Sequence, residues 1–107
     1  MPIVSEELQN GVFVCLAICA ADGFISKEEE EILEVEFEKN FNVSAIQFQN
    51  LIDLFFKSSN EIEVFLDAVH ASHLRGQLLN IAKEAAAADG LDIRENIAWN
   101  KCNVYWS

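Results

Sequence analysis

The sequence predicts an all-α protein, a compact bundle of about six helices with two pseudo-symmetric helix-turn-helix units. Apolar residues recur at helical spacing along most of the chain, and the alternating pattern of β-strands does not. One Pro and four Gly in 107 residues are too few for a turn-rich all-β fold. Two Asp-Gly turns lie near opposite ends of the chain, each between helical patterns. Since a chain of this length holds one core, residues 1–107 are expected to form a single domain.

The expected first and second helices flank the first Asp-Gly turn. The first follows Ser5, and its apolar face consists of Leu8, Val12, Cys15, Leu16 and Cys19. Other apolar residues cover most of its remaining surface, which predicts a central helix that ends at Asp22-Gly23. Ser26 and Glu29 have the spacing of a capping box at the start of the second helix. The expected buried positions of that helix are Leu33, Phe37 and Phe41, with a break at 40–43.

Two helices are expected in the middle of the chain. The third begins after Ser44 and is interrupted at 57–59. Its buried positions are Phe48, Leu51, Ile52 and Phe55. A short fourth helix begins near 60–63, buries Phe65, Leu66 and Val69, and is followed by a break or kink around 70–72.

The last two expected helices flank the second Asp-Gly turn. The fifth runs from Leu74 to Asp89-Gly90, and its Ala-rich end allows a neighbouring helix to approach closely. Its buried positions are Leu78, Ile81, Ala82, Ala85 and Ala88. Asp92 and Glu95 form a second predicted capping box at the start of the sixth helix. That helix is expected to bury Ile93, Ile97 and Cys102, with Val104 or Tyr105 as a further buried position.

The charge balance limits the ligands of this chain. Eighteen Asp and Glu against seven Lys and Arg give a net charge of −11, which phosphate backbones and anionic membranes repel. Nucleic acid binding and membrane insertion are therefore not expected, and the longest apolar stretch, 11–21, is shorter than the ~20 residues of a membrane helix. Cys15, Cys19 and Cys102 cannot all pair with one another in disulfides, which favours a reducing cytoplasm. The charge leaves cations, basic proteins or a partner that recruits counter-ions, and cations are the simplest of these because clustered carboxylates need neutralising.

One short pattern occurs twice in the sequence. Each copy joins the end of an apolar helix, an Asp-Gly turn, an N-cap residue and a Glu three positions after the cap. The matching residues are Asp22, Gly23, Ser26 and Glu29 in the first copy and Asp89, Gly90, Asp92 and Glu95 in the second. The cap follows the Asp by four residues in the first copy and by three in the second. The pairing predicts that the two acidic turns are neighbours in the fold.

The paired turns resemble those of the TerB-like tellurite-resistance family. The resemblance rests on Ala21-Asp22-Gly23 followed by Ile25-Ser26 and Glu29, and on Ala88-Asp89-Gly90-Leu91-Asp92 followed by Glu95. In layout it covers nearly the whole of this small acidic chain. It implies an all-α fold with related halves and a cation site made of acidic residues near the turns. It also implies a role in bacterial stress or tellurite resistance, with no established catalysis.

The acidic residues of the two turns form the predicted metal site: Asp22, Glu29, Asp89, Asp92 and Glu95. A divalent cation such as Ca²⁺, Mg²⁺, Mn²⁺ or Zn²⁺ would relieve the repulsion between carboxylates brought together there. An EF-hand is not expected, because Ala or Ile stands two and four residues before each turn Asp, where its loop needs oxygen ligands. A purely structural role is the competing hypothesis, since all five residues also fit turns or caps.

Two other groups have weak metal-ligand character. Cys15 and Cys19 lie one helical turn apart, but without a second pair at ligand spacing they are better interpreted as core residues. His70 and His73 share a potential helix face with Asp67, and an exposed helix junction explains them more simply.

No motif in the sequence predicts an enzyme. Neither a nucleophile paired with a base nor a Gly-rich phosphate loop has a recognisable signature. The second hypothesis for function is a protein-interaction module, either an adaptor or a dimer contact, in which the turns are structural. Its surface would be the acidic second helix or the aromatic group Trp99, Tyr105 and Trp106.

Overall fold

The computed structural model describes residues 6–20, 25–57, 62–68, 75–87 and 93–105. They form six helices: α1 (Glu6–Cys19), α2 (Lys27–Phe41), α3 (Ala45–Lys57), α4 (Ile62–Ala68), α5 (Arg75–Ala86) and α6 (Ile93–Tyr105). No strand occurs among these residues, so the predicted all-α bundle of about six helices is confirmed. None of the described helices is long and apolar enough to span a bilayer.

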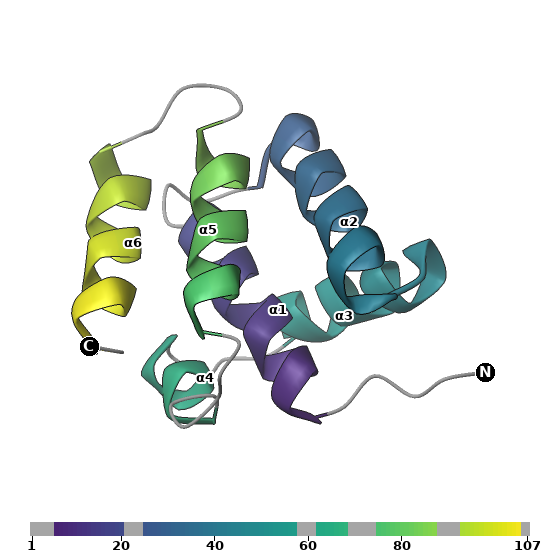
Figure 1. Cartoon of the computed structure of the whole chain (residues 1–107), viewed down its shortest axis with the longest axis horizontal. Helices are drawn as coiled ribbons and strands as arrows, with labels where there is room; N and C mark the ends of the chain where they lie inside the picture. Colours follow the sequence, from purple (N-terminus) through teal and green to yellow (C-terminus); the bar gives the residue numbers. More distant parts are fainter. Residues whose placement is uncertain (1–5, 21–24, 58–61, 69–74, 88–92, 106–107) are drawn as a thin grey trace.

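The bundle is built around α1, the helix that the sequence predicts to be central. It contacts α3, α4, α5 and α6 (Figure 1). The neighbouring α5 also contacts α2 and α6, and these two helices lie on opposite sides of it in Figure 1. The Cα radius of gyration is 12.4 Å, close to the ~13 Å of a compact 100-residue domain. The described helices therefore share one core.

Most of the core side chains come from α1 and α5. The buried apolar residues of these helices are Val12, Val14, Cys15, Leu16, Ile18, Cys19, Leu78, Leu79, Ile81, Ala82, Ala85 and Ala86. The remaining helices and the α2–α3 connection add Leu33, Phe37, Val43, Phe48, Leu51, Phe65, Leu66 and Cys102. The predicted buried positions of the first five helices are confirmed where described, except that Leu8, Phe41, Ile52 and Phe55 are only partly buried. Val69 and Ala88 lie outside the described residues.

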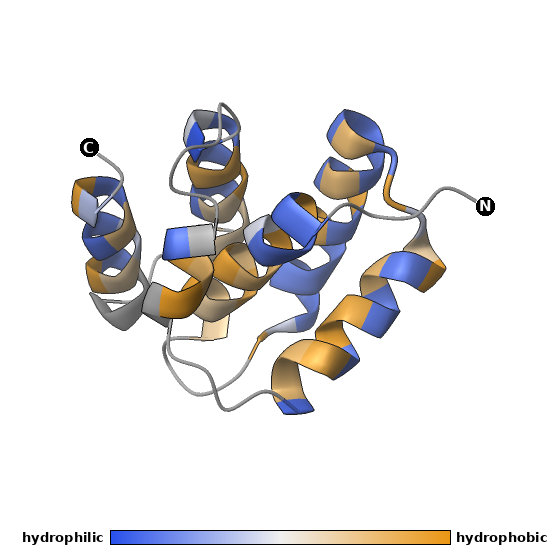
Figure 2. Cartoon of the chain, turned by 90° about the horizontal axis from the view of Figure 1, so that it is seen from below, coloured by the Kyte–Doolittle hydropathy of each residue, from blue (hydrophilic) through white to orange (hydrophobic). Residues whose placement is uncertain are grey.

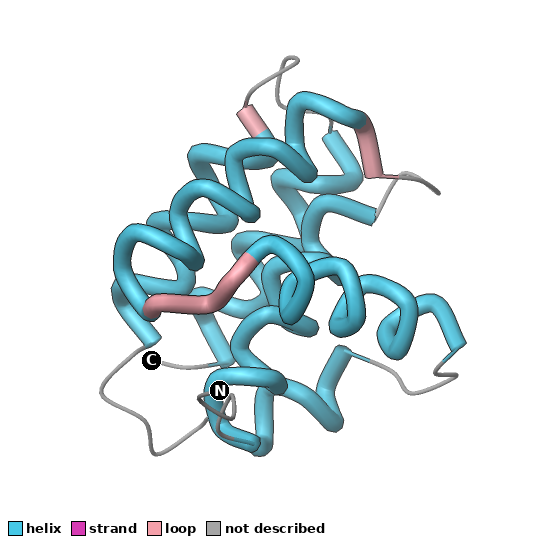
Figure 3. The backbone as a smooth tube through the Cα atoms, turned by 90° about the vertical axis from the view of Figure 1, so that its right-hand side faces the viewer, coloured by secondary structure: helices cyan, strands magenta, loops and turns pink. Residues whose placement is uncertain are grey.

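The end of α2 has a left-handed cap at Asn42. Asn42 has φ 61° and ψ 30°, and its N–H donates a hydrogen bond of 3.0 Å to the Glu38 carbonyl. Asn adopts this conformation more readily than most residues. The connection to α3 is residues 42–44, drawn as a loop in Figure 3, and Val43 within it is buried. The predicted break at 40–43 is thereby confirmed.

The inward side of α6 differs from the prediction. Ile97 is 63% exposed and Val104 is 73% exposed, so the prediction that Ile97 is buried is wrong. Of the two alternatives for a further buried position, Tyr105 is the one that packs against the core. Cys102 is buried as predicted, and Trp99 packs on the same side. Figure 2 shows the resulting orange and blue segments on α6, the helix that leads to the C label.

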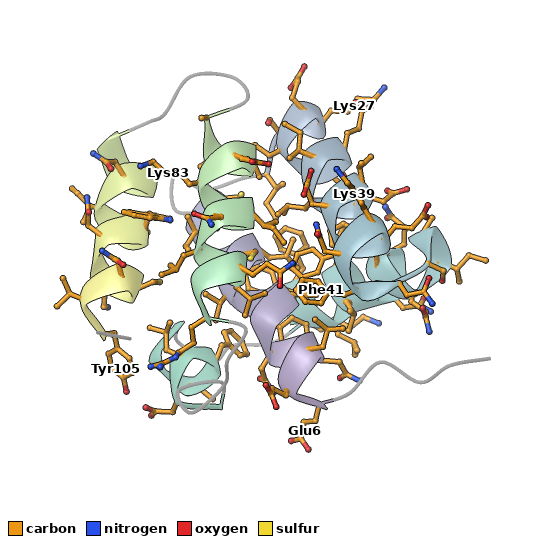
Figure 4. The ribbon with its side chains drawn as sticks, in the orientation of Figure 1. Glu6, Lys27, Lys39, Phe41, Lys83 and Tyr105 are labelled. Carbon is orange, nitrogen blue, oxygen red and sulfur yellow. The ribbon has the colours of Figure 1, made fainter. Side chains whose placement is uncertain are left out.

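Side-chain contacts with α5 and α4 determine which side of α6 faces the core. The indole N–H of Trp99 donates a hydrogen bond of 2.8 Å to the Leu79 carbonyl, and the Lys83 ammonium lies 4.7 Å from the centre of the Trp99 ring. At the other end of α6, the Tyr105 hydroxyl hydrogen-bonds to Asp67 of α4 (Figure 4). Residues two positions apart lie on nearly opposite sides of a helix, so an inward Trp99 turns Ile97 outward.

The helices α1 and α5 pack tightly at Gly11. A Cβ atom at Gly11 would lie 2.9 Å from Cδ1 of Leu78, a fully buried side chain. The Gly therefore permits this helix contact because it has no side chain. Gly76, in the first turn of α5, has nothing within 4 Å of the corresponding position.

The two glycines predict opposite effects of substitution by Ala. Gly76→Ala should stabilise the fold by about 0.4–1 kcal/mol, because it restricts the unfolded chain without a clash. Gly11→Ala has the same benefit, but overpacking against Leu78 costs about 1–3 kcal/mol and makes the net effect destabilising. Urea denaturation of both variants measures the difference. Equal stabilisation by both substitutions would show that the α1–α5 contact is not close-packed.

Candidate metal centre

Glu29 is the predicted metal ligand whose side chain the structure describes, and it forms a capping box with Ser26. The Glu29 N–H donates a hydrogen bond of 3.2 Å to Ser26 Oγ, and the Ser26 N–H donates one of 3.0 Å to Glu29 Oε1. Ser26 is extended at φ −71° and ψ 160°, and its carbonyl accepts the Glu30 N–H. The capping box predicted for the start of α2 is thereby confirmed.

The second carboxylate oxygen of Glu29 has no such partner. The side chain is 1% exposed, and Oε2 accepts no hydrogen bond from the described part of the chain. A buried carboxylate that lacks full compensation for its lost hydration is destabilising by several kcal/mol. The position at the N-terminus of α2 offsets only about 0.3–2 kcal/mol of such a cost. Among the described residues, Oε2 is therefore a buried side-chain oxygen that needs a ligand.

A second capping box, at the start of α3, shows what the cap itself requires. The Gln47 N–H donates a hydrogen bond of 3.2 Å to Ser44 Oγ, and the Ser44 N–H donates one of 2.9 Å to Gln47 Oε1. The distances match those at Ser26 and Glu29, yet Gln47 carries no charge. An amide oxygen therefore suffices for this cap. This box is not among the sequence predictions, although the Ser-x-x-Gln spacing is a signal for it.

The other carboxylates in the first turn of α2 have a different environment. Glu28 is exposed, and Glu30 accepts a hydrogen bond of 2.7 Å from the side-chain amide of Gln49 on α3. Both are consistent with the preference for negative charge at a helix N-terminus. Glu29 differs from them because it is enclosed and one of its oxygens has no described partner.

The remaining predicted ligands are not described. Asp22, Asp89 and Asp92 lie outside the described residues, as does the side chain of Glu95 at the start of α6. Within the described part of the chain, no group of three or more His, Cys, Asp or Glu side chains is arranged to hold a metal ion. The described helices nevertheless locate the first turn of α2: it lies at the end of the bundle where α5 ends and α6 begins (Figure 1). The α2 and α5 helices are in contact.

The three cysteines are core residues in the structure. Cys15, Cys19 and Cys102 are buried with free thiols. Burial, with a smaller contribution from Cys102, raises the pKa of the Cys15 thiol far above its usual value, and Cys15 Sγ lies 3.4 Å from the Leu78 carbonyl. A protonated thiol is neither a nucleophile nor a metal ligand. The geometry therefore agrees with the interpretation of Cys15 and Cys19 as packing residues.

The His and aromatic groups contribute no described site. His70, His73 and Trp106 lie outside the described residues. The described members of the two groups bond within the protein, since Tyr105 is joined to Asp67 and Trp99 to α5. Trp99 and Tyr105 are partly buried against the core. They therefore hold α6 in place rather than present an open aromatic surface.

Comparisons with known proteins leave the family open. No family model, curated protein or solved structure matches this chain. The TerB-like resemblance therefore stays a prediction that rests on the residues of the two Asp-Gly turns.

The comparison of the two capping boxes predicts the effect of removing the Glu29 charge. Without divalent cations, Glu29→Gln should keep the box and unfold with a free energy at least as large as that of the wild type, because the buried charge is removed. Glu29→Ala, the control, also loses the oxygen that accepts the Ser26 N–H, and leaving this buried donor unpaired should destabilise the fold by about 1–3 kcal/mol. Urea denaturation at neutral pH measures both. A Gln variant as unstable as the Ala variant would show that the fold requires the charge.

Proposed function

We propose that this protein is a small domain that binds a divalent cation at the acidic turn before α2, with Glu29 as a ligand. The observation that carries the proposal is Glu29 Oε2, a buried carboxylate oxygen that accepts no hydrogen bond from the described residues. The further ligands proposed from the sequence are Asp22, Asp89, Asp92 and Glu95. A TerB-like role in stress or tellurite resistance follows from the resemblance, and location in the cytoplasm follows from the three cysteines; both are part of the same proposal.

A cation suits this oxygen better than a neutral hydrogen-bond donor. A donor would satisfy one lone pair but would leave the negative charge enclosed in a poorly hydrated environment. A divalent cation neutralises the charge and accepts an oxygen ligand directly. The competing structural role does not account for the charge, since the box at Ser44 is completed by the uncharged Gln47.

Ion titration of matched variants tests the cation site. Calorimetry with Ca²⁺, Mg²⁺, Mn²⁺ and Zn²⁺ in turn should detect binding of at least one ion, and Glu29→Gln should weaken it by at least about tenfold because a ligand is lost. Bound Mn²⁺ should broaden the amide signals of residues 26–30 much more strongly than those of residues 44–47 in the second capping box.

The control is Gln47→Glu, which places a carboxylate in the second capping box, beyond the end of α2 opposite to Glu29. This variant should bind the same ion with unchanged affinity and stoichiometry. Absence of binding in the wild type, or unchanged binding in Glu29→Gln, would reject the proposed function.

The outward face of α6 supports a second candidate function, contact with another copy of the chain. Ile97 and Val104 are both exposed and lie two turns apart. The described α6 side chains, at 96–105, include no Asp or Glu, although the chain carries a net charge of −11. Two copies can therefore meet along α6 with less repulsion than at the acidic face of α2. We propose weak dimerisation there as the alternative to cation binding.

Sedimentation at increasing protein concentration tests the α6 contact. We expect dimers to form only at high concentration, because two exposed side chains per copy bury far less than the ~1,200 Å² of a stable interface. Val104→Lys should abolish them. Ile46→Lys on α3, where Ile46 is 69% exposed, is the control and should leave them intact. Wild-type protein that stays monomeric, or dimers lost equally in both variants, would reject this candidate.

A further inference from the structure

The two oxygens of Glu29 have separate environments, and this separation determines how the residue can bind an ion. Oε1 accepts the Ser26 N–H at 3.0 Å, whereas Oε2 accepts nothing from the described residues. We propose that a divalent cation binds Glu29 through Oε2 alone and that its binding strengthens the N-cap of α2. This inference rests on the proposed function, because it states how the same site would be used.

The capping bond favours ligation through a single oxygen. A cation that took both oxygens would compete with the Ser26 N–H for Oε1. Ser26 is 9% exposed, so its N–H would have little access to water as a replacement partner. Leaving such a donor unpaired is unfavourable. Oε2 takes no part in the capping bond, so an ion bound to Oε2 leaves the capping box intact.

An ion on Oε2 and the N–H on Oε1 hold the same rigid carboxylate. Each contact restricts the rotation of the Glu29 side chain and thereby favours the other, so the two are thermodynamically linked. The burial of Oε2 strengthens this link. Because the oxygen is enclosed, the atoms that cover it must move for an ion to enter or leave. Opening of the cap and release of the ion are then parts of one event, and ion occupancy controls the order of the first turn of α2.

Hydrogen exchange measured by NMR tests this coupling on the full chain. The reporters are the amides of Ser26 and Glu29, whose hydrogens form the box. The titrant is the ion with the highest affinity among Ca²⁺, Mg²⁺ and Zn²⁺. At a free ion concentration about a hundred times Kd, exchange through openings that release the ion should slow by about a hundredfold. The amides of Ser44 and Gln47, in the uncharged box, should change much less and serve as the internal control.

Each outcome of this experiment is decisive. Slower exchange at Ser26 and Glu29, absent in Glu29→Gln, supports the coupling. Ion binding with unchanged exchange at these amides would overturn the inference while the proposed function stands. Faster exchange at Ser26 upon binding would show that the ion takes Oε1 as well, which also overturns it. No ion binding at all would reject both the inference and the proposed function.

Discussion

The close packing of α1 against α5 is the constraint on which the other contacts depend. Gly11 lets the two helices approach until Leu78 fills the space that a side chain would occupy, and Cys15 contacts the Leu78 carbonyl from the same side. α5 in turn positions α2 on one side and α6 on the other. The location of Glu29 relative to the end of α5 therefore follows from a helix contact that contains no polar site residue. A change in this contact would move α2 as a body, together with its N-terminal corner.

Glu29 combines a structural and a proposed binding role because its two oxygens have different environments, one in the capping box and one without a described hydrogen-bond partner. The structural role is common in proteins, and Gln47 fulfils it in the same chain without a charge. A Glu in place of Gln at position 29 adds nothing to the cap that the Ser44 box lacks, but it encloses a negative charge. Proteins retain such unfavourable groups mainly where they bind or react. The two capping boxes of this chain therefore distinguish the capping role, which Gln47 and Glu29 share, from the negative charge, which belongs to Glu29 alone.

Local patterns correctly predicted the described helices and the capping box at Ser26, because both depend on residues a few positions apart. The burial of α1 followed from an apolar surface on almost every side, and the Ser26 cap followed from its spacing to Glu29. The orientation of α6 did not follow, since helical periodicity leaves Ile97 and Trp99 as alternative inward residues. The choice depends on the Leu79 carbonyl, which belongs to another helix. The burial of Glu29 could not be predicted from the sequence either, because burial at a helix start depends on which helices pack beside it.

The acidity of the chain and the proposed site are separate properties with different physical origins. Exposed carboxylates on α2, such as Glu28, Glu31 and Glu38, attract any cation, but salt screens them beyond about 8 Å and water already solvates them. They raise the local concentration of cations without selecting one. Glu29 is enclosed, so salt screens its charge only weakly. Its free oxygen needs a defined ligand in place of the water that the fold excludes. The net charge of −11 can therefore draw ions toward the protein, whereas the proposed specific binding depends on Glu29, the one carboxylate that the fold buries among the described residues.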